Sequence, residues 1–271
     1  MLAIAALSLA GGVGALVLLR YGDGLLSGEK RRHGDWLTIT YPAHLRGRID
    51  AAIADITQAR ADLRDWFGTD IGALKVDIGD YPNPSFGIGY MRLPQGEVAR
   101  GGRVHSIWHE IVHVAGAPGS LFGEGLAEDF ENRFAFAGAA TAGHRNIGRA
   151  VALFHRDGDY FLPSALLDEE IGGSDRLESE ATRMREYATA SAFATYVISV
   201  AFPQVPARET ARHYMALARY DDLAPFRFPE AVLRRHLNGM TVAELEPGWY
   251  RHLRDRWNFR LPPKPGIAGQ I

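Results

Sequence analysis

The stretch His109-Glu110-Ile111-Val112-His113 decides how the rest of this chain is interpreted. Two histidines four residues apart lie on the same face of a helix, one above the other. Their imidazoles can share one zinc ion at about 2.0–2.1 Å. Glu110 is rotated by about 100° around the helix from His109, which leaves its carboxylate near a metal-bound water without ligating the metal. The stretch therefore predicts a helix that carries a metal site and a general base.

A third ligand is required, because two histidines alone do not hold a catalytic zinc ion. His105 lies four residues before His109. However, the distance from His105 to His113 is about 12 Å along a helix axis, too long for all three imidazoles to meet at one tetrahedral ion. We therefore expect His105 to lie at the start of the helix or at the rim of a cleft.

A second helix is predicted over residues 122–130, after a Pro-Gly turn and with Ser120 available as the N-cap. Glu124 and Glu128 lie four residues apart on one face of this helix. One carboxylate can ligate the metal while the other accepts a hydrogen bond from a ligand imidazole, which fixes the imidazole tautomer. The alternative is a solvated face formed by Glu124, Glu128 and Glu131. The position of these carboxylates shortly after the two histidines, next to small glycines, favours the metal site.

Outside these two helices, the spacing of apolar and polar residues predicts an α+β fold. A small N-terminal β-sheet subdomain with a helix is followed by a mainly helical subdomain. Residues 36–41 and 74–78 alternate between apolar and polar side chains and predict strands. Residues 86–91 predict a third strand, whose glycines permit close backbone approach. Apolar residues recur at helical spacing over 49–67, and the pattern is mostly helical from Val104 onward.

The N-terminus predicts a membrane anchor over residues 1–20. Residues 2–19 carry no charge, and eighteen residues form a helix of about 27 Å, close to the hydrocarbon thickness of about 30 Å. A cleaved signal peptide and a buried core helix are the alternatives. Arg20 and Lys30–Arg32 follow the apolar run and favour a cytoplasmic body, but an upstream start would reverse this, so the membrane side stays open. Residues 21–35 are interpreted as a linker.

Composition narrows the possible chemistry. The chain has 271 residues and a formal net charge of −2, so it has no basic excess for binding a nucleic acid backbone. Cysteine is absent, which excludes disulfides, thiolate nucleophiles and cysteine-based zinc sites. A metal ion would have to be held by carboxylates and by some of the ten histidines.

The two helical segments together resemble the gluzincin metallopeptidases, and most of all the compact peptidase MA-like domains. The resemblance is carried by His109–His113 followed by Gly123-Glu-Gly-Leu-Ala-Glu128, and by a later helix from Tyr187 to Tyr196. The resemblance covers residues 36–257, and it is weaker outside these motifs. Residues 258–271 are interpreted as a C-terminal tail. The large aminopeptidases separate the second histidine from the glutamate by more residues than this chain does. The resemblance implies a zincin-like helical subdomain.

The resemblance also implies roles for individual residues. One Zn²⁺ ion per chain would be held by His109, His113 and Glu124. Glu110 would be the general base, and Glu128 would support a ligand imidazole. Tyr187 would stabilise the oxyanion, although a tyrosine packed on an amphipathic helix is the alternative.

In gluzincins, an edge strand before the zinc helix pairs with extended peptide. By resemblance, Gly87, Ile88, Gly89 and Tyr90 would bind the substrate here. The resulting hypothesis is a membrane-anchored zinc peptidase that acts on peptides or proteins. Two alternatives stay open: a catalytically inactive zincin-fold module that binds a partner at the membrane, and a hydrolase of non-peptide amides.

Overall fold

The computed structural model describes residues 28–136, 151, 161–167, 171, 180–221 and 228–257. The chain divides into two compact units. The sheet unit comprises Met1–Asp55 and Ile71–Val104, and the helical unit comprises Ile56–Asp70 and His105–Ile271. The predicted membrane anchor and the C-terminal tail lie outside the described residues. Within the described ranges, no helix has the length and apolar character needed to cross a membrane.

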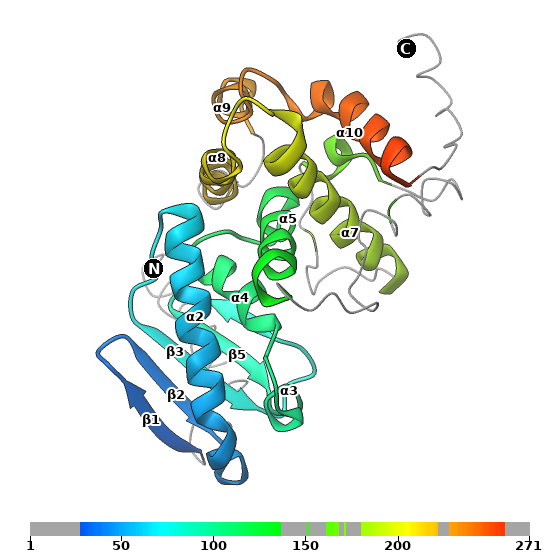
Figure 1. The fold of residues 1–271 in the computed structure, drawn as a ribbon. Coiled ribbons are helices and arrows are strands. Elements are labelled where there is room, and N and C mark those ends of the chain that lie inside the picture. The colour runs from blue at the N-terminus through cyan, green and yellow to red at the C-terminus, as the bar shows by residue number, and fades with distance from the viewer. Residues whose placement is uncertain are drawn as a thin grey trace, which may run out of the picture. The chain divides into compact units, whose positions relative to one another are not determined.

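The sheet unit contains a five-stranded mixed sheet in the order β1-β2-β3-β5-β4 (Figure 1). The strands are β1 (Glu29–His33), β2 (Leu37–Tyr41), β3 (Leu74–Gly79), β4 (Ser85–Gly87) and β5 (Tyr90–Pro94). The central strands β2, β3 and β5 are parallel, with Ile39 opposite Val76 and Val76 opposite Met91. These three side chains are fully buried and form the centre of the sheet's apolar core. The strands predicted over 36–41 and 74–78 are confirmed.

The prediction of a linker over residues 21–35 is wrong at Glu29–His33, which form β1. This strand pairs antiparallel with β2, with Arg31 opposite Ile39. Four of its five side chains are exposed and no buried face is present, so the strand has no apolar alternation that sequence analysis could detect. A charged strand of this kind is typical of a protected sheet edge.

The single strand predicted over residues 86–91 is also wrong, because these residues form a hairpin. The strands β4 and β5 pair antiparallel, with Gly87 opposite Tyr90, and the turn consists of Ile88 and Gly89. Gly89 has a φ of 65°, a left-handed conformation that glycine adopts without steric cost and that tight hairpin turns require. The glycines of this segment therefore permit a chain reversal. Of the two hairpin strands, only β4 lies at an edge of the sheet, and Tyr90 lies in β5, between β3 and β4.

Short helices and part of a long helix complete the sheet unit. These are the 3₁₀ helix η1 (Ala43–Arg48), the helix α3 (Gln95–Arg100) and the beginning of α2 (Ile49–Phe67), whose residues from Ile56 onward belong to the helical unit. The predicted apolar positions of α2, such as Ile49, Ile56 and Leu63, are buried. The helix ends where predicted, before Gly68, whose φ is 67°.

The helical unit is built around α5, whose residues are all buried. After the end of α2, the described elements of this unit are, in chain order, α4 (Ser106–Val114), α5 (Leu121–Phe130), the π-helix η2 (Glu131–Ala135), the 3₁₀ helix η3 (Pro163–Leu166), α7 (Glu180–Tyr196), the π-helix η4 (Val197–Ala201), α8 (Ala207–Asp221), α9 (Glu230–His236) and α10 (Val242–Trp257). The helix α5 packs against α4, α7 and α8 (Figure 1). A small sheet followed by mainly helical structure confirms the α+β class, whereas a zincin-like identity stays a prediction.

Candidate metal centre

The helices α4 and α5 carry the predicted metal ligands and pack against each other. Ser120 is the N-cap of α5, as predicted, and its Oγ accepts a hydrogen bond of 3.1 Å from the amide of Gly123. A Cβ at Gly125 would lie 2.5 Å from the carbonyl oxygen of Ala190 in α7. The absence of a side chain at Gly125 therefore permits the close approach of α7 beside Glu124.

The three predicted ligands come together in the helical unit. The Nε2 atoms of His109 and His113 are 3.1 Å apart, and Oε2 of Glu124 lies 3.2 Å from the first and 3.5 Å from the second. A tetrahedral ion with bonds of about 2.0–2.1 Å separates its ligand atoms by roughly 3.3–3.4 Å. The three atoms thus already have the spacing of one face of a zinc coordination tetrahedron, and they form a group that can hold a metal ion.

A hydrogen bond from Nδ1 of His113 leaves Nε2 as the nitrogen that can bind a metal ion. Its Nδ1 lies 2.6 Å from the carbonyl oxygen of Ala117. Since a carbonyl only accepts, Nδ1 carries the proton, and Nε2 of the neutral ring presents its lone pair to His109 and Glu124. Oε2 of Glu124 is buried and makes no hydrogen bond in the described structure. A buried carboxylate oxygen that faces two imidazole nitrogens fits a cation among them.

The electrostatics of the centre lead to the same conclusion. Burial alone would lower the pKa of His109, but the adjacent Glu124 carboxylate, and then Glu128 and Glu110, raise it to about 10. Burial alone would raise the pKa of Glu124, but His113 and His109 lower it to about 2. Without a metal, the carboxylates thus draw positive charge into the cluster as a bound proton. A divalent cation would take the place of that proton.

The other face of His109 contacts two further carboxylates. Its Nδ1 lies 3.7 Å from Oε1 of Glu128 and 3.7 Å from Oε2 of Glu131. Glu128 is thus close to the imidazole it was predicted to support, although 3.7 Å exceeds hydrogen-bond distance. The three side chains form a second group that can hold a cation. Glu131 was expected only as part of a solvated face, but its spacing of seven residues from Glu124, which is two helical turns, was a signal that could have identified it.

The two predicted catalytic side chains also lie in the helical unit. Glu110 is buried in α4, one residue after His109. Tyr187 comes from α7, and its ring centroid lies 6.5 Å from that of His109. Burial, together with the carboxylates of Glu124, Glu110 and Glu128, raises the pKa of Tyr187 well above its usual range. Its hydroxyl therefore keeps its proton and remains a hydrogen-bond donor at neutral pH.

The remaining candidates are not members of this group of ligands. His105 is the N-cap residue of α4 and stacks on Phe136 with ring centroids 4.1 Å apart, so it lies at the helix start as expected. The predicted substrate-binding residues Gly87, Ile88, Gly89 and Tyr90 belong to the sheet unit. Ile88 is fully exposed at the hairpin turn. Their substrate role stays a prediction.

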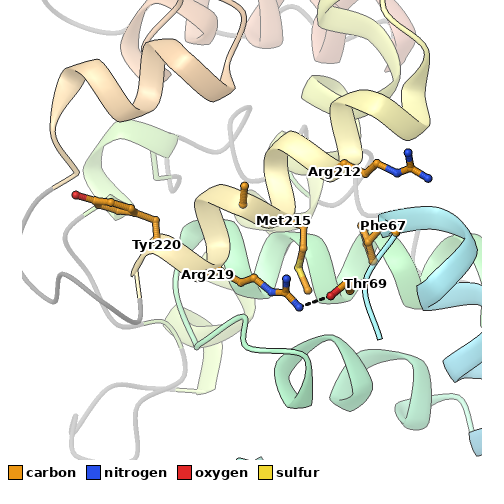
Figure 2. Close-up of a pocket in the computed structure, with 8 residues that line it drawn as sticks. Phe67, Thr69, Arg212, Met215, Arg219 and Tyr220 are labelled. Atoms are coloured by element: carbon orange, nitrogen blue, oxygen red, sulfur yellow. Dashed lines mark hydrogen bonds between the residues drawn. The ribbon is translucent and has the colours of Figure 1, made fainter. Parts of the chain in front are cut away.

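A separate cavity of about 330 Å³ lies between α8 and residues 67–69, and Figure 2 shows its lining. The guanidinium of Arg219 points toward Thr69, while Arg212 and Tyr220 extend away from it in opposite directions (Figure 2). Nε and Nη2 of Arg219 also donate to the carbonyl oxygen of Ala115, at 2.9 and 2.7 Å. Ala115 is the C-cap of α4, so Arg219 satisfies a carbonyl at the end of the helix that carries both histidines.

The buried group of His109, His113 and Glu124 is therefore the strongest candidate for chemistry among the described residues. Its donor set of two imidazoles and one carboxylate suits Zn²⁺ and leaves a fourth tetrahedral position for water or substrate. Glu110 and Tyr187 supply a carboxylate and a hydroxyl from the same helices that form the group or pack beside it. No known protein-family model matches this chain, and no curated protein matches it at a significant level.

Proposed function

We propose that this chain is a zinc-dependent peptidase of the gluzincin type, attached to a membrane through the apolar segment at residues 1–20. One observation carries the proposal. Three ligand atoms of His109, His113 and Glu124 lie 3.1–3.5 Å apart on two packed helices, and Glu110 follows His109 in the sequence. The chemistry of this donor set, together with the resemblance of the two helical segments to gluzincins, supports the assignment.

The proposed mechanism assigns a proton-transfer role to Glu110. A zinc ion held by the three ligands would lower the pKa of its bound water to about 7 and polarise the substrate carbonyl. Glu110 accepts a proton from the attacking water and passes it to the leaving amine, the work of a general acid–base residue. The position of Glu110 beside a ligand on the same helix keeps its carboxylate near the reacting water without making it a ligand.

Tyr187 is proposed to stabilise the oxyanion. Its pKa is raised by burial and by the carboxylates around it, so its hydroxyl carries the proton that it donates to the developing negative charge. One such donor contributes about 3–4 kcal/mol to transition-state stabilisation. Tyr187→Phe should therefore lower kcat and kcat/KM together while leaving zinc content unchanged.

The ligand set is tested by variants that separate the two candidate groups. His113 belongs only to the group with Glu124, and Glu131 belongs only to the group of His109 with Glu128. His113→Ala and Glu124→Ala should each lower zinc affinity by more than about 100-fold, since even residues that only support a ligand change it by 10- to 100-fold. Glu131→Ala should retain the ion. The reverse pattern, measured by metal analysis after dialysis, would place the ion in the other group.

The activity is tested with Glu110→Gln. This variant should retain about one zinc ion per chain and lose at least about 100-fold in hydrolysis of quenched-fluorescence peptides, the usual contribution of a general base. Wild type and Glu131→Ala serve as active controls. Zinc-free protein from metal-replete cells, or full activity of Glu110→Gln, would contradict the proposed function. A zinc-loaded wild type without turnover on any peptide would instead support the inactive binding module.

A further inference from the structure

A second pair of histidines faces one another across the helices α8 and α9. The Nδ1 atoms of His213 and His236 are 3.4 Å apart, and their tilted rings have centroids 5.6 Å apart. This spacing equals the roughly 3.3–3.4 Å that separates two ligand atoms on one tetrahedral ion. It also resembles the 3.1 Å between the Nε2 atoms of His109 and His113. Neither residue of the second pair belongs to the proposed active site.

The histidine pair lines a small pocket with room for an ion and water. The pocket has a volume of about 90 Å³ and is also lined by Glu209, Thr210 and Arg235. A water molecule occupies about 30 Å³ of liquid volume, so the space corresponds to about three waters. Glu209 precedes His213 by one helical turn on α8, which places both side chains on one face of the helix. Its carboxylate lines the same pocket and adds negative charge to it, although its oxygens do not lie within 4.8 Å of both imidazoles.

Charged groups around the pair act in opposite directions on a bound cation. Burial, and then the neighbouring His213 and Arg235, lower the pKa of His236 below its usual range. A neutral imidazole presents the lone pair that a metal requires. The Arg235 guanidinium opposes a cation in the same pocket, while the Glu209 carboxylate favours it. The opposing charges predict weaker binding than at the first centre, where the carboxylates of Glu124, Glu128 and Glu110 surround His109.

We propose that His213 and His236 form a second, weaker site for a divalent transition metal, whose coordination is completed by water. Imidazole ligands suit Zn²⁺, Cu²⁺ and Ni²⁺. An ion bound at this site links α8 to α9, two helices that are separated along the chain. This site does not depend on the proposed peptidase activity.

The test uses full-length protein in which both ligand groups around His109 have been silenced by His109→Ala and Glu124→Ala. After removal of metal with a chelator, Zn²⁺ is titrated by calorimetry at pH 7.5. About one equivalent should still bind. Adding His213→Ala or His236→Ala should weaken that binding by at least about tenfold, because one of the two imidazole ligands is lost. His44→Ala, which removes an exposed histidine in η1, is the matched control and should leave the binding unchanged.

Three results would overturn this site: no zinc binding in the silenced background, binding unaffected by loss of either histidine, or equal weakening by His44→Ala, which would indicate non-specific surface binding. Circular dichroism confirms the fold of each variant, and His213→Gln replaces His213→Ala if the smaller residue disturbs α8. The outcome is separable from the proposed function. If the first centre is wrong, His113→Ala in the otherwise native chain leaves zinc binding unchanged. If the second site is wrong, His213→Ala and His236→Ala leave zinc binding in the silenced protein unchanged.

Discussion

Replacing Gly125 by alanine would test the helix packing that surrounds the candidate metal centre. A Cβ at this position would lie 2.5 Å from the carbonyl oxygen of Ala190 and 3.0 Å from its carbonyl carbon. Ordinary contact begins at 3.4 Å, so the shortfall is 3.4 − 2.5, or about 0.9 Å. Both partners are backbone atoms of the buried residue Ala190 and cannot rotate away as a side chain would. The helices α5 and α7 must therefore separate locally.

The expected cost follows from two opposing effects. Overpacking of a well-packed core costs about 1–3 kcal/mol, and a clash with backbone belongs to the upper part of this range. Replacing glycine by alanine inside a helix stabilises by about 0.5–1 kcal/mol. We therefore expect Gly125→Ala to destabilise the protein by about 2 kcal/mol, or to lower Tm by roughly 4–8 °C at about 2–4 °C per kcal/mol. Because Glu124 is the preceding residue, zinc affinity should also fall.

The assay is urea unfolding followed by circular dichroism, with Gly96→Ala as the control. Gly96 lies in α3, and an added Cβ would meet nothing within 4 Å, so this change should stabilise by up to about 1 kcal/mol. A Gly125→Ala protein as stable as wild type would refute the close approach of α5 and α7. It would also remove the packing argument for the position of Glu124.

Three further changes test other parts of the structure. Ser120→Ala removes the N-cap of α5 and should destabilise by about 1 kcal/mol, while Ser120→Asn should restore most of this in the same urea titration. Asp62→Ala removes the acceptor 2.8 Å from the indole nitrogen of Trp108, which is fully buried. We expect Asp62→Ala to lower the free energy of unfolding by about 1–3 kcal/mol in the urea titration. Asp62→Asn keeps an acceptor oxygen and should lower it by less. The Arg234 guanidinium and the start of α10 lower the pKa of Glu244 from 4.5 to about 2, so its stabilisation is present above pH 4.5 and disappears as the pH falls toward 2. Thermal unfolding between pH 2 and pH 7 should show a smaller pH dependence for Glu244→Gln than for wild type, and equal profiles would contradict this assignment.

Local patterns were sufficient to predict several elements. The helix over residues 49–67, its end before Gly68, the strands of 36–41 and 74–78, and the Ser120 cap are all present. Each follows from the spacing of apolar residues or from a single capping side chain, which depend on neighbours in the sequence. Residues 86–91 were predicted as one strand but form a hairpin. Glycines within an apolar run are compatible with either structure, and the pairing of β4 with β5 determines which one forms.

The amino-acid sequence by itself determined the pair His109 and His113, since an i, i+4 spacing on a helix brings two imidazoles together whatever surrounds them. It also indicated Glu124 as the third ligand candidate through resemblance. Only the tertiary structure decided that Glu131 faces His109 and that His213 faces His236. The physical reason is that a side chain's partners on other helices depend on how those helices pack, and no periodicity within one segment specifies that packing.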